Sequence, residues 1–252
     1  MKKSEANVTS SLPSREGLRV SLLPSFYLAP ISYYAQLLRC ESVVIDRDEI
    51  YRKQTLRNRC YIASPNGPLA LTIPVVKFVP YHTPMRDIRI SDHGNWRHLH
   101  WNALQSSYGR TPFFEFYADD FAPFYEKKWE FLFDYNQALQ TMVSELMGVE
   151  TCSSSLRRSA LAMLSPNEVT ERTRLLSSPS ASFTLHPSSF TLPPYYQLFS
   201  DRQGFMPDLS IVDLLFNLGP ESILYLTKLR LPDNPESPEY PVNPEDTENT
   251  QK

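Results

Sequence analysis

The hydrophobic positions in the first part of the chain predict short strands around one helix. Residues 18–23 alternate in the manner of a strand, and residues 42–46 form a short apolar run typical of a buried strand. Between them, residues 31–38 repeat apolar side chains at helical spacing, and Pro30 suits a helix start. Strand, helix and strand in this order predict an α/β unit with a mixed sheet.

Two further apolar segments predict a β-hairpin. Residues 60–62 and 69–73 read as strands, and Pro65-Asn66-Gly67 lies between them as a turn. Residues 86–90 alternate and predict another strand. These strands complete a sheet-rich part that we place at residues 18–92.

The rest of the folded chain has helical spacing. We expect helices at about 95–108, at about 119–147 with Gly148 as its stop, and at 211–217. The predicted fold class is therefore α/β, with a mixed β-sheet in the N-terminal part and a helical C-terminal part. Residues 151–190 are rich in Ser, Leu and Pro and predict short helices and extended loops.

The two ends of the chain lack a hydrophobic pattern. Residues 1–17 are polar and predict a disordered arm, and residues 231–252 repeat Pro with Glu and Asp. Such an acidic, proline-rich composition cannot bury enough apolar surface to fold. We therefore expect one α/β domain at residues 18–230, sheet-rich over 18–92 and helix-rich over 93–230.

Composition and charge narrow the functional classes. The 252 residues carry a formal net charge of −3, with a pI of about 6.0, which argues against broad nucleic-acid binding. No apolar run approaches the roughly 20 residues of a membrane-spanning helix, and the N-terminus lacks the pattern of a secretory signal. We expect a cytoplasmic protein without a membrane span.

The sequence predicts no cofactor and no metal. Neither G-x-G-x-x-G nor G-x-x-x-x-G-K-[ST] occurs, so the common nucleotide-binding loops are missing. Cys40, Cys60 and Cys152 form no C-x-x-C pair, which gives no indication of a zinc or dithiol site. His98 and His100 stand two residues apart, on different faces of the predicted helix, and no H-E-x-x-H pattern is present.

A basic block at residues 52–59 is the first candidate site. Arg57 and Arg59 are suited to bidentate binding of a phosphate or carboxylate, with Lys53 as a point charge and Asn58 as an amide donor. In strand register the two arginines would point to the same side as a paired clamp. The alternative is a solvated loop whose cations pair with the nearby acidic residues at 46–49.

The second candidate is the segment from Trp96 to Trp101. His100 is a possible general acid or base, since the pKa of histidine is tuned around neutral pH. A histidine among tryptophans is more often a hydrogen-bonded core residue, and that alternative stays open.

The third candidate combines Tyr195-Tyr196-Gln197-Leu198-Phe199, residues 204–207 and the helix predicted at 211–217, which contains Asp213. An aspartate buried there needs a partner. It is either an ion-pair partner of the basic block or a catalytic carboxylate.

These residues fall within motifs through which the chain resembles the WbqC-like protein family. The points of resemblance run in order from about residue 18 to residue 220. They are the proline–aromatic turn at 22–33, the basic block from Tyr51 to Arg59, residues 71–75, Trp96-Arg97-x-x-His100-Trp101, Tyr108, residues 112–114, Tyr196-Gln197, Pro207 and residues 209–219. The chain departs from the family at Leu22-Leu23, where many members have His-Gln, and across residues 152–190.

The resemblance implies a transferase acting on an activated sugar or acyl donor in bacterial surface polysaccharide biosynthesis. In that hypothesis Arg57 and Arg59 hold an anionic donor, His100 is the general acid or base, and Asp213 positions the site. The remaining substrate-binding assignments from the motifs are Lys53, Asn58, Arg97 and Tyr196. The alternative is a non-catalytic protein that binds an anionic metabolite or a protein partner through the same arginines.

Overall fold

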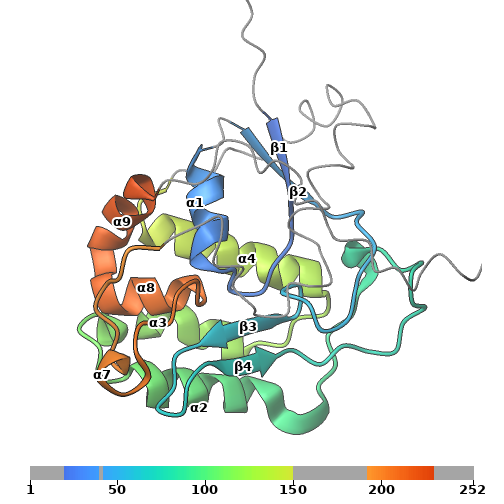
Figure 1. Cartoon of the computed structure of the whole chain (residues 1–252). Coiled ribbons are helices and arrows are strands. Elements are labelled where there is room, and N and C mark those ends of the chain that lie inside the picture. The colour runs from blue at the N-terminus through green and yellow to red at the C-terminus, as the bar shows by residue number, and fades with distance from the viewer. Residues whose placement is uncertain (1–19, 40–41, 150–191, 230–252) are drawn as a thin grey trace, which may run out of the picture.

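The computed structural model describes residues 20–39, 42–149 and 192–229 (Figure 1). The predicted arm at 1–17, the predicted tail at 231–252, the segment 151–190, and Cys40 and Cys152 lie outside these residues. The disorder predicted at the two ends therefore stays a prediction.

The chain begins with the expected strand–helix–strand unit. Strand β1 (Val20–Pro24) pairs in parallel with β2 (Ser42–Asp46), and helix α1 (Ile31–Arg39) connects them. The hydroxyl of Tyr33 on α1 donates a hydrogen bond to the carbonyl of Pro24 (2.9 Å), which fastens the helix to the strand. The helical spacing seen in the sequence thus corresponds to the buried face of α1, where Ile31, Tyr34 and Ala35 are at most 1% exposed.

The predicted hairpin is also confirmed. Strands β3 (Arg59–Ile62) and β4 (Leu69–Thr72) pair antiparallel. Ser64 and Gly67 exchange backbone hydrogen bonds of 3.1 Å around the turn, and Gly67 has a φ of 102°, which favours glycine.

Helices make up most of the remaining chain. They are the short η1 (Met85–Asp87) and η2 (His93–Asn95), then α2 (Trp96–Tyr108), α3 (Phe114–Glu126), α4 (Leu132–Leu146), α7 (Ser200–Gln203), α8 (Ile211–Leu218), η3 (Gly219–Glu221) and α9 (Ser222–Lys228). None of the helices within the described residues is long and apolar enough to cross a membrane.

Two local predictions are wrong at the same place in the fold. Residues 86–90 begin in η1 and do not form a strand, and the helix predicted at 119–147 is interrupted between α3 and α4. At the interruption, the Ile90 N–H donates to the Glu130 carbonyl (2.9 Å) and the Leu132 N–H donates to the Ile88 carbonyl (2.9 Å). These two hydrogen bonds hold the chain around Phe131, which has extended backbone angles, against residues 88–90, and this overrides the helical spacing.

The fold class is confirmed, because the described strands lie in the N-terminal part and helices follow. The strands form two separate two-stranded sheets, one parallel and one antiparallel. One hydrophobic core joins them to the helices, and α8 is central to it: Phe216 packs against Tyr108, Phe114 and Phe121 with ring centroids 5.1–5.3 Å apart.

Gly219 ends α8 in a conformation that other residues rarely adopt. Its φ is 55°, and an added Cβ would lie 2.5 Å from the Phe113 ring. We expect Gly219→Ala to lower the free energy of unfolding by about 2–3 kcal/mol through backbone strain and overpacking. Gly94 has a φ of 79° but nothing within 4 Å of an added Cβ. Gly94→Ala therefore isolates the strain, and urea unfolding of both variants should show a smaller loss for Gly94→Ala.

Candidate functional site

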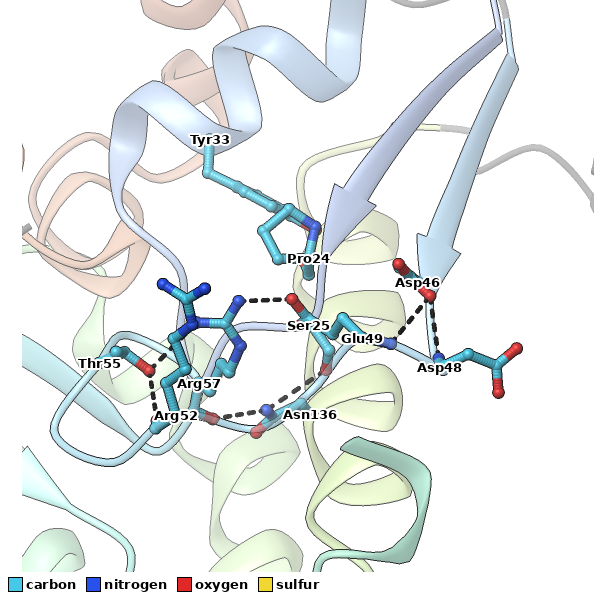
Figure 2. Close-up of polar contacts among 10 residues, drawn as sticks. All are labelled: Pro24, Ser25, Tyr33, Asp46, Asp48, Glu49, Arg52, Thr55, Arg57 and Asn136. Atoms are coloured by element: carbon cyan, nitrogen blue, oxygen red, sulfur yellow. Dashed lines mark hydrogen bonds and ion pairs between the residues drawn. The ribbon is translucent and has the colours of Figure 1, made fainter. Parts of the chain in front are cut away.

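Arg57 of the basic block forms a buried ion pair with Glu49. The side chains are 2% and 5% exposed, and Arg57 Nη2 lies 2.5 Å from Glu49 Oε2 (Figure 2). Burial raises the pKa of the Glu49 carboxyl, and the charge and hydrogen bond of Arg57 oppose that rise. The pairing with an acidic neighbour that the alternative interpretation expected is present, although it is buried and not solvated.

Arg57 and Arg59 do not share a strand register. β3 begins at Arg59, so the alternation on which the paired clamp depended does not reach Arg57. The Arg57 carbonyl accepts a hydrogen bond from Nδ2 of Asn136 on α4 (2.8 Å), as Figure 2 shows. Asn58 is equally committed to the fold, because its Nδ2 donates to the carbonyl of Ile73 (2.9 Å) and its own carbonyl accepts from the Ile73 N–H (2.8 Å).

Arg59 keeps donors that no described residue accepts, as the exposed Arg52 of the same block also does. It is half-buried, and its Nε donates to Thr72 Oγ1 (2.9 Å) across the hairpin. Among the described residues, no carboxylate lies within ion-pair distance of Arg59. Its two terminal nitrogens therefore remain available to an anion.

Two aromatic side chains lie beside Lys53, and one of them, Tyr51, is close enough to Arg59 for the charge of Arg59 to affect its pKa. The exposed Lys53 places Nζ 5.1 Å from the centroid of the Phe78 ring, and Phe78 meets Tyr51 edge-on at 4.9 Å. Burial raises the pKa of Tyr51, whereas the charges of Arg57 and Arg59 lower it. The buried Tyr51 hydroxyl has no hydrogen-bond partner in the described structure. We call Tyr51, Lys53, Arg59 and Phe78 the cation–aromatic cluster.

His100 on α2 lies in the core behind the hairpin. It is 4% exposed, and its Nδ1 lies 3.0 Å from the hydroxyl of Tyr27, which in turn lies 3.0 Å from the hydroxyl of Tyr125. Burial lowers the pKa of His100 to about 4, against a smaller rise caused by its hydrogen bond to the Thr72 backbone. The ring is therefore neutral at pH 7, with Nε2 donating to the Thr72 carbonyl and Nδ1 accepting from Tyr27.

Thr72 is where the first two candidate motifs meet. Its hydroxyl accepts from Arg59, and its carbonyl accepts from His100. Helix α2, which carries His100, runs alongside β4 (Figure 1). The hairpin thus brings Arg59 and His100 to opposite sides of one residue, although the sequence separates them by about forty positions.

Asp213 belongs to a separate buried cluster. It is fully buried on α8 and accepts hydrogen bonds from the Tyr108 hydroxyl (3.0 Å), from Gln197 Nε2 (2.9 Å) and from the Tyr195 hydroxyl. Burial raises the pKa of Asp213, and the three donors oppose that rise. No cation of the described residues forms an ion pair with it, so the expected pairing with the basic block is not found.

The Asp213 cluster is connected to the hairpin through Tyr108. The Tyr108 hydroxyl accepts a hydrogen bond from the Ala63 N–H (3.0 Å), directly after β3. The sequence grouped Tyr195 with the Asp213 helix but gave it no role of its own, and it did not assign Tyr108 to a site.

The last two predicted residues lie beside these clusters without joining their hydrogen bonds. Nη1 of Arg97 pairs with Asp92 Oδ1 (2.7 Å), and Cζ of Arg97 lies 4.8 Å from the Trp96 ring centroid. Tyr196 is 56% exposed, between two residues that face Asp213. Within the part of the chain that the structure describes, no group of three His, Cys, Asp or Glu side chains is arranged to hold a metal ion.

Comparisons with known proteins agree with the motifs. The model of the WbqC-like protein family matches residues 25–225. A curated protein from Mycobacterium tuberculosis (strain ATCC 25618 / H37Rv), "Uncharacterized protein Rv1507c", is 28% identical over 233 residues, which cover 84% of this chain and 99% of that protein. No solved structure gives a significant match. The family model covers most of the chain, and the chain therefore belongs to the WbqC-like protein family.

Proposed function

We propose that the protein is a transferase that acts on an activated sugar or acyl donor in surface polysaccharide biosynthesis, and that the cation–aromatic cluster binds the anionic group of that donor. The observation that carries the proposal is Arg59. It is half-buried and held through Nε by Thr72, and among the described residues no carboxylate neutralises it.

The chemistry of the cluster suits a phosphate or another oxyanion. A guanidinium fixed at one nitrogen presents its remaining N–H groups in a planar fork that matches two oxygens of a phosphate. Lys53 adds a second positive charge, and the Tyr51 hydroxyl adds a donor that has no partner of its own. Arg57 and Asn58, assigned to substrate binding from the sequence, support the cluster by holding its loop in place.

His100 and Asp213 keep their predicted roles within this proposal. His100 is neutral at pH 7, so it is in the state that a general base requires. Both of its ring nitrogens are hydrogen-bonded inside the protein, so donor binding must release one of them before a proton moves. Asp213 positions Tyr195 and Gln197, and these flank the exposed Tyr196.

The second candidate is a protein that binds an anionic metabolite without turnover. The burial of His100 favours it, because a ring that is 4% exposed and bonded at both nitrogens resembles a structural histidine. The two candidates share the cation–aromatic cluster and differ in whether His100 acts on a substrate.

Arg59→Gln tests the donor site. Nucleotide sugars and acyl thioesters are first screened by thermal shift, and every compound that binds is then assayed for turnover. We expect Arg59→Gln to weaken binding by about 10- to 100-fold, because a charge-assisted hydrogen bond contributes roughly 1.5–3 kcal/mol. Arg52, exposed in the same block, is the matched control, and Arg52→Gln should change affinity by less than about threefold.

The outcomes separate the candidates. Turnover that His100→Asn abolishes supports the transferase. Binding without turnover for any of these compounds, with equal affinity in His100→Asn, supports the binding protein. Equal affinities of Arg59→Gln and wild type would contradict both.

A further inference from the structure

A second group of unused donors lies at the start of α2, away from the cation–aromatic cluster. Arg97 is 12% exposed and gives only Nη1 to a protein acceptor, the carboxylate of Asp92 (2.7 Å). Its Nε and Nη2 are buried and have no acceptor in the described structure, and the same holds for Nε1 of Trp129. Nε and Nη2 lie on the same edge of a guanidinium, and we call them the Arg97 fork.

Several contacts bring the Arg97 fork and Trp129 to one place. Trp96, which lies under the Arg97 guanidinium, packs edge-on against Tyr135 with centroids 5.8 Å apart, and Trp129 packs against the same tyrosine at 5.6 Å. The Arg97 charge also lowers the pKa of Tyr135 against a larger rise caused by burial. Lys128, the neighbour of Trp129, binds Asp92 Oδ2 (3.0 Å), the carboxylate that Arg97 contacts.

The local charge favours an anion. Asp92 is shared by Arg97 and Lys128, whose hydrogen bonds lower its pKa. Two cations therefore face one carboxylate, which leaves one positive charge in excess. The nearby pair of Arg89 and Glu130 (2.8 Å) is neutral and does not change this balance.

The geometry of the donors selects the ligand. The Nε and Nη2 hydrogens of one guanidinium point in nearly the same direction, which fits two oxygens of a carboxylate or phosphate side by side. The indole N–H of Trp129 is a donor that cannot accept. The site thus offers donors and positive charge, and a buried donor left without an acceptor is unfavourable.

We propose that the Arg97 fork and Trp129 Nε1 bind the oxyanion of a ligand, a carboxylate or a phosphate group. This site shares no residue with the cation–aromatic cluster and does not depend on the proposed transferase activity. The sequence motif pointed to Arg97 as a substrate-binding residue; its partner Trp129 and the chemistry of the ligand come from the structure. Both side chains are partly exposed, but the three donor atoms are buried, so a surface side chain has to move before an anion reaches the fork.

The indole N–H signals of a ¹⁵N-labelled protein test the proposal directly. The chain has 3 tryptophans, so it gives three indole signals, and Trp129→Phe identifies the one of Trp129. Inorganic phosphate and acetate are titrated separately into the full chain, with chloride as the ionic-strength control. We expect the Trp129 signal to shift in a saturable way with phosphate, acetate or both. The Trp101 indole, which packs against Phe114 and Tyr125 and not against Arg97 or Trp129, serves as an internal reference and should stay in place.

Two arginines of similar surroundings provide matched variants. Arg89 makes one ion pair with Glu130 and stacks 5.3 Å above the Phe131 ring, as Arg97 does with Asp92 and Trp96, but it is 59% exposed. We expect Arg97→Gln to weaken binding at least tenfold and Arg89→Gln to leave it within twofold. Should Arg97→Gln fail to fold, Trp129→Phe keeps an aromatic ring against Phe124 and removes the N–H donor together with part of the indole. Its binding, followed at the Arg97 Nε–H signal, should also be weaker.

Three results would overturn the proposal. They are a shift that grows linearly with concentration and equals that of chloride, a saturable shift unchanged by Arg97→Gln, and a shift that Arg59→Gln abolishes but Arg97→Gln does not. Saturation by phosphate alone or by acetate alone supports the site and identifies the group it prefers. The proposed function is tested separately: the effect of Arg59→Gln on the binding of nucleotide sugars or acyl thioesters concerns the cation–aromatic cluster and is measured by thermal shift, not by the indole signals.

Discussion

Replacing Arg57 with methionine is expected to lower the free energy of unfolding by about 3–5 kcal/mol at pH 7. The substitution leaves the buried carboxylate of Glu49 without its ion-pair partner, and an uncompensated buried charge is strongly destabilising. Methionine keeps most of the side-chain volume, so a cavity contributes little to the loss. Urea unfolding of wild type and variant measures the difference.

The loss should depend on pH in a direction that the pKa of Glu49 determines. Burial already raises that pKa in the folded state, and removal of Arg57 raises it further. A carboxyl group whose folded pKa exceeds its unfolded pKa binds more protons when folded, so stability is lost as pH rises between the two values. The deficit of Arg57→Met should therefore be small below about pH 4, near the ordinary carboxyl pKa, and should grow toward pH 7.

Two controls make this result specific to the ion pair. Arg52→Met removes an exposed cation of the same block and should change stability by less than about 0.5 kcal/mol. The double variant Glu49→Gln, Arg57→Met removes both charges. It should recover part of the lost stability, and its deficit should not grow toward pH 7. A deficit of the single variant that stays constant from pH 4 to pH 8 would contradict the role of the Glu49 charge.

Asp213→Ala is expected to destabilise the protein by a similar amount, about 3–5 kcal/mol. It leaves the Tyr108 and Tyr195 hydroxyls without their acceptor, and each unsatisfied donor costs about 1–3 kcal/mol. Gln197 loses one of its acceptors but keeps the Met206 carbonyl. Part of this loss is offset, because the raised pKa of Asp213 means that burying its charge is itself unfavourable. Thermal and urea unfolding measure the loss.

The partner Tyr108 provides the cross-check. Tyr108→Phe removes one donor to Asp213 and the acceptor of the Ala63 N–H, so the double variant with Asp213→Ala should lose less than the sum of the two single variants. Asp119→Ala, at an exposed position of α3, is the control and should stay within about 0.5 kcal/mol of wild type. Strict additivity of Tyr108 and Asp213 would mean that the hydrogen bond between them contributes nothing.

Local patterns predicted the elements whose hydrogen bonds are local. The turn residues of the β3–β4 hairpin are visible in the sequence, and α1 shows its buried face in the spacing of its apolar residues. Helix α8 is an apolar segment that is buried on all sides. The helix predicted at 119–147 was wrong because its interruption depends on backbone partners at residues 88–90, about forty positions away. Apolar spacing continues through residues 130–132 and contains no sign of that pairing.

In the candidate site, too, the sequence identified some features and the tertiary structure supplied the others. Residue type pointed to Arg59, His100, Arg97 and Asp213, because charged and titratable side chains in apolar or aromatic surroundings need partners. The partners themselves came from contacts across the fold, such as Thr72 between Arg59 and His100, and Tyr195 and Gln197 around Asp213.

The sequence by itself therefore determined the family, the fold class, most elements and the residue types that carry the chemistry. Only the tertiary structure decided which cations are neutralised by ion pairs within the protein and which keep free hydrogen-bond donors. Arg57 and Arg59 are two residues apart and chemically identical, yet Arg57 pairs with Glu49 in the core and Arg59 keeps its terminal nitrogens free. The physical reason is that a charge is neutralised by whatever lies within a few ångströms of it, and folding, not chain order, sets those distances.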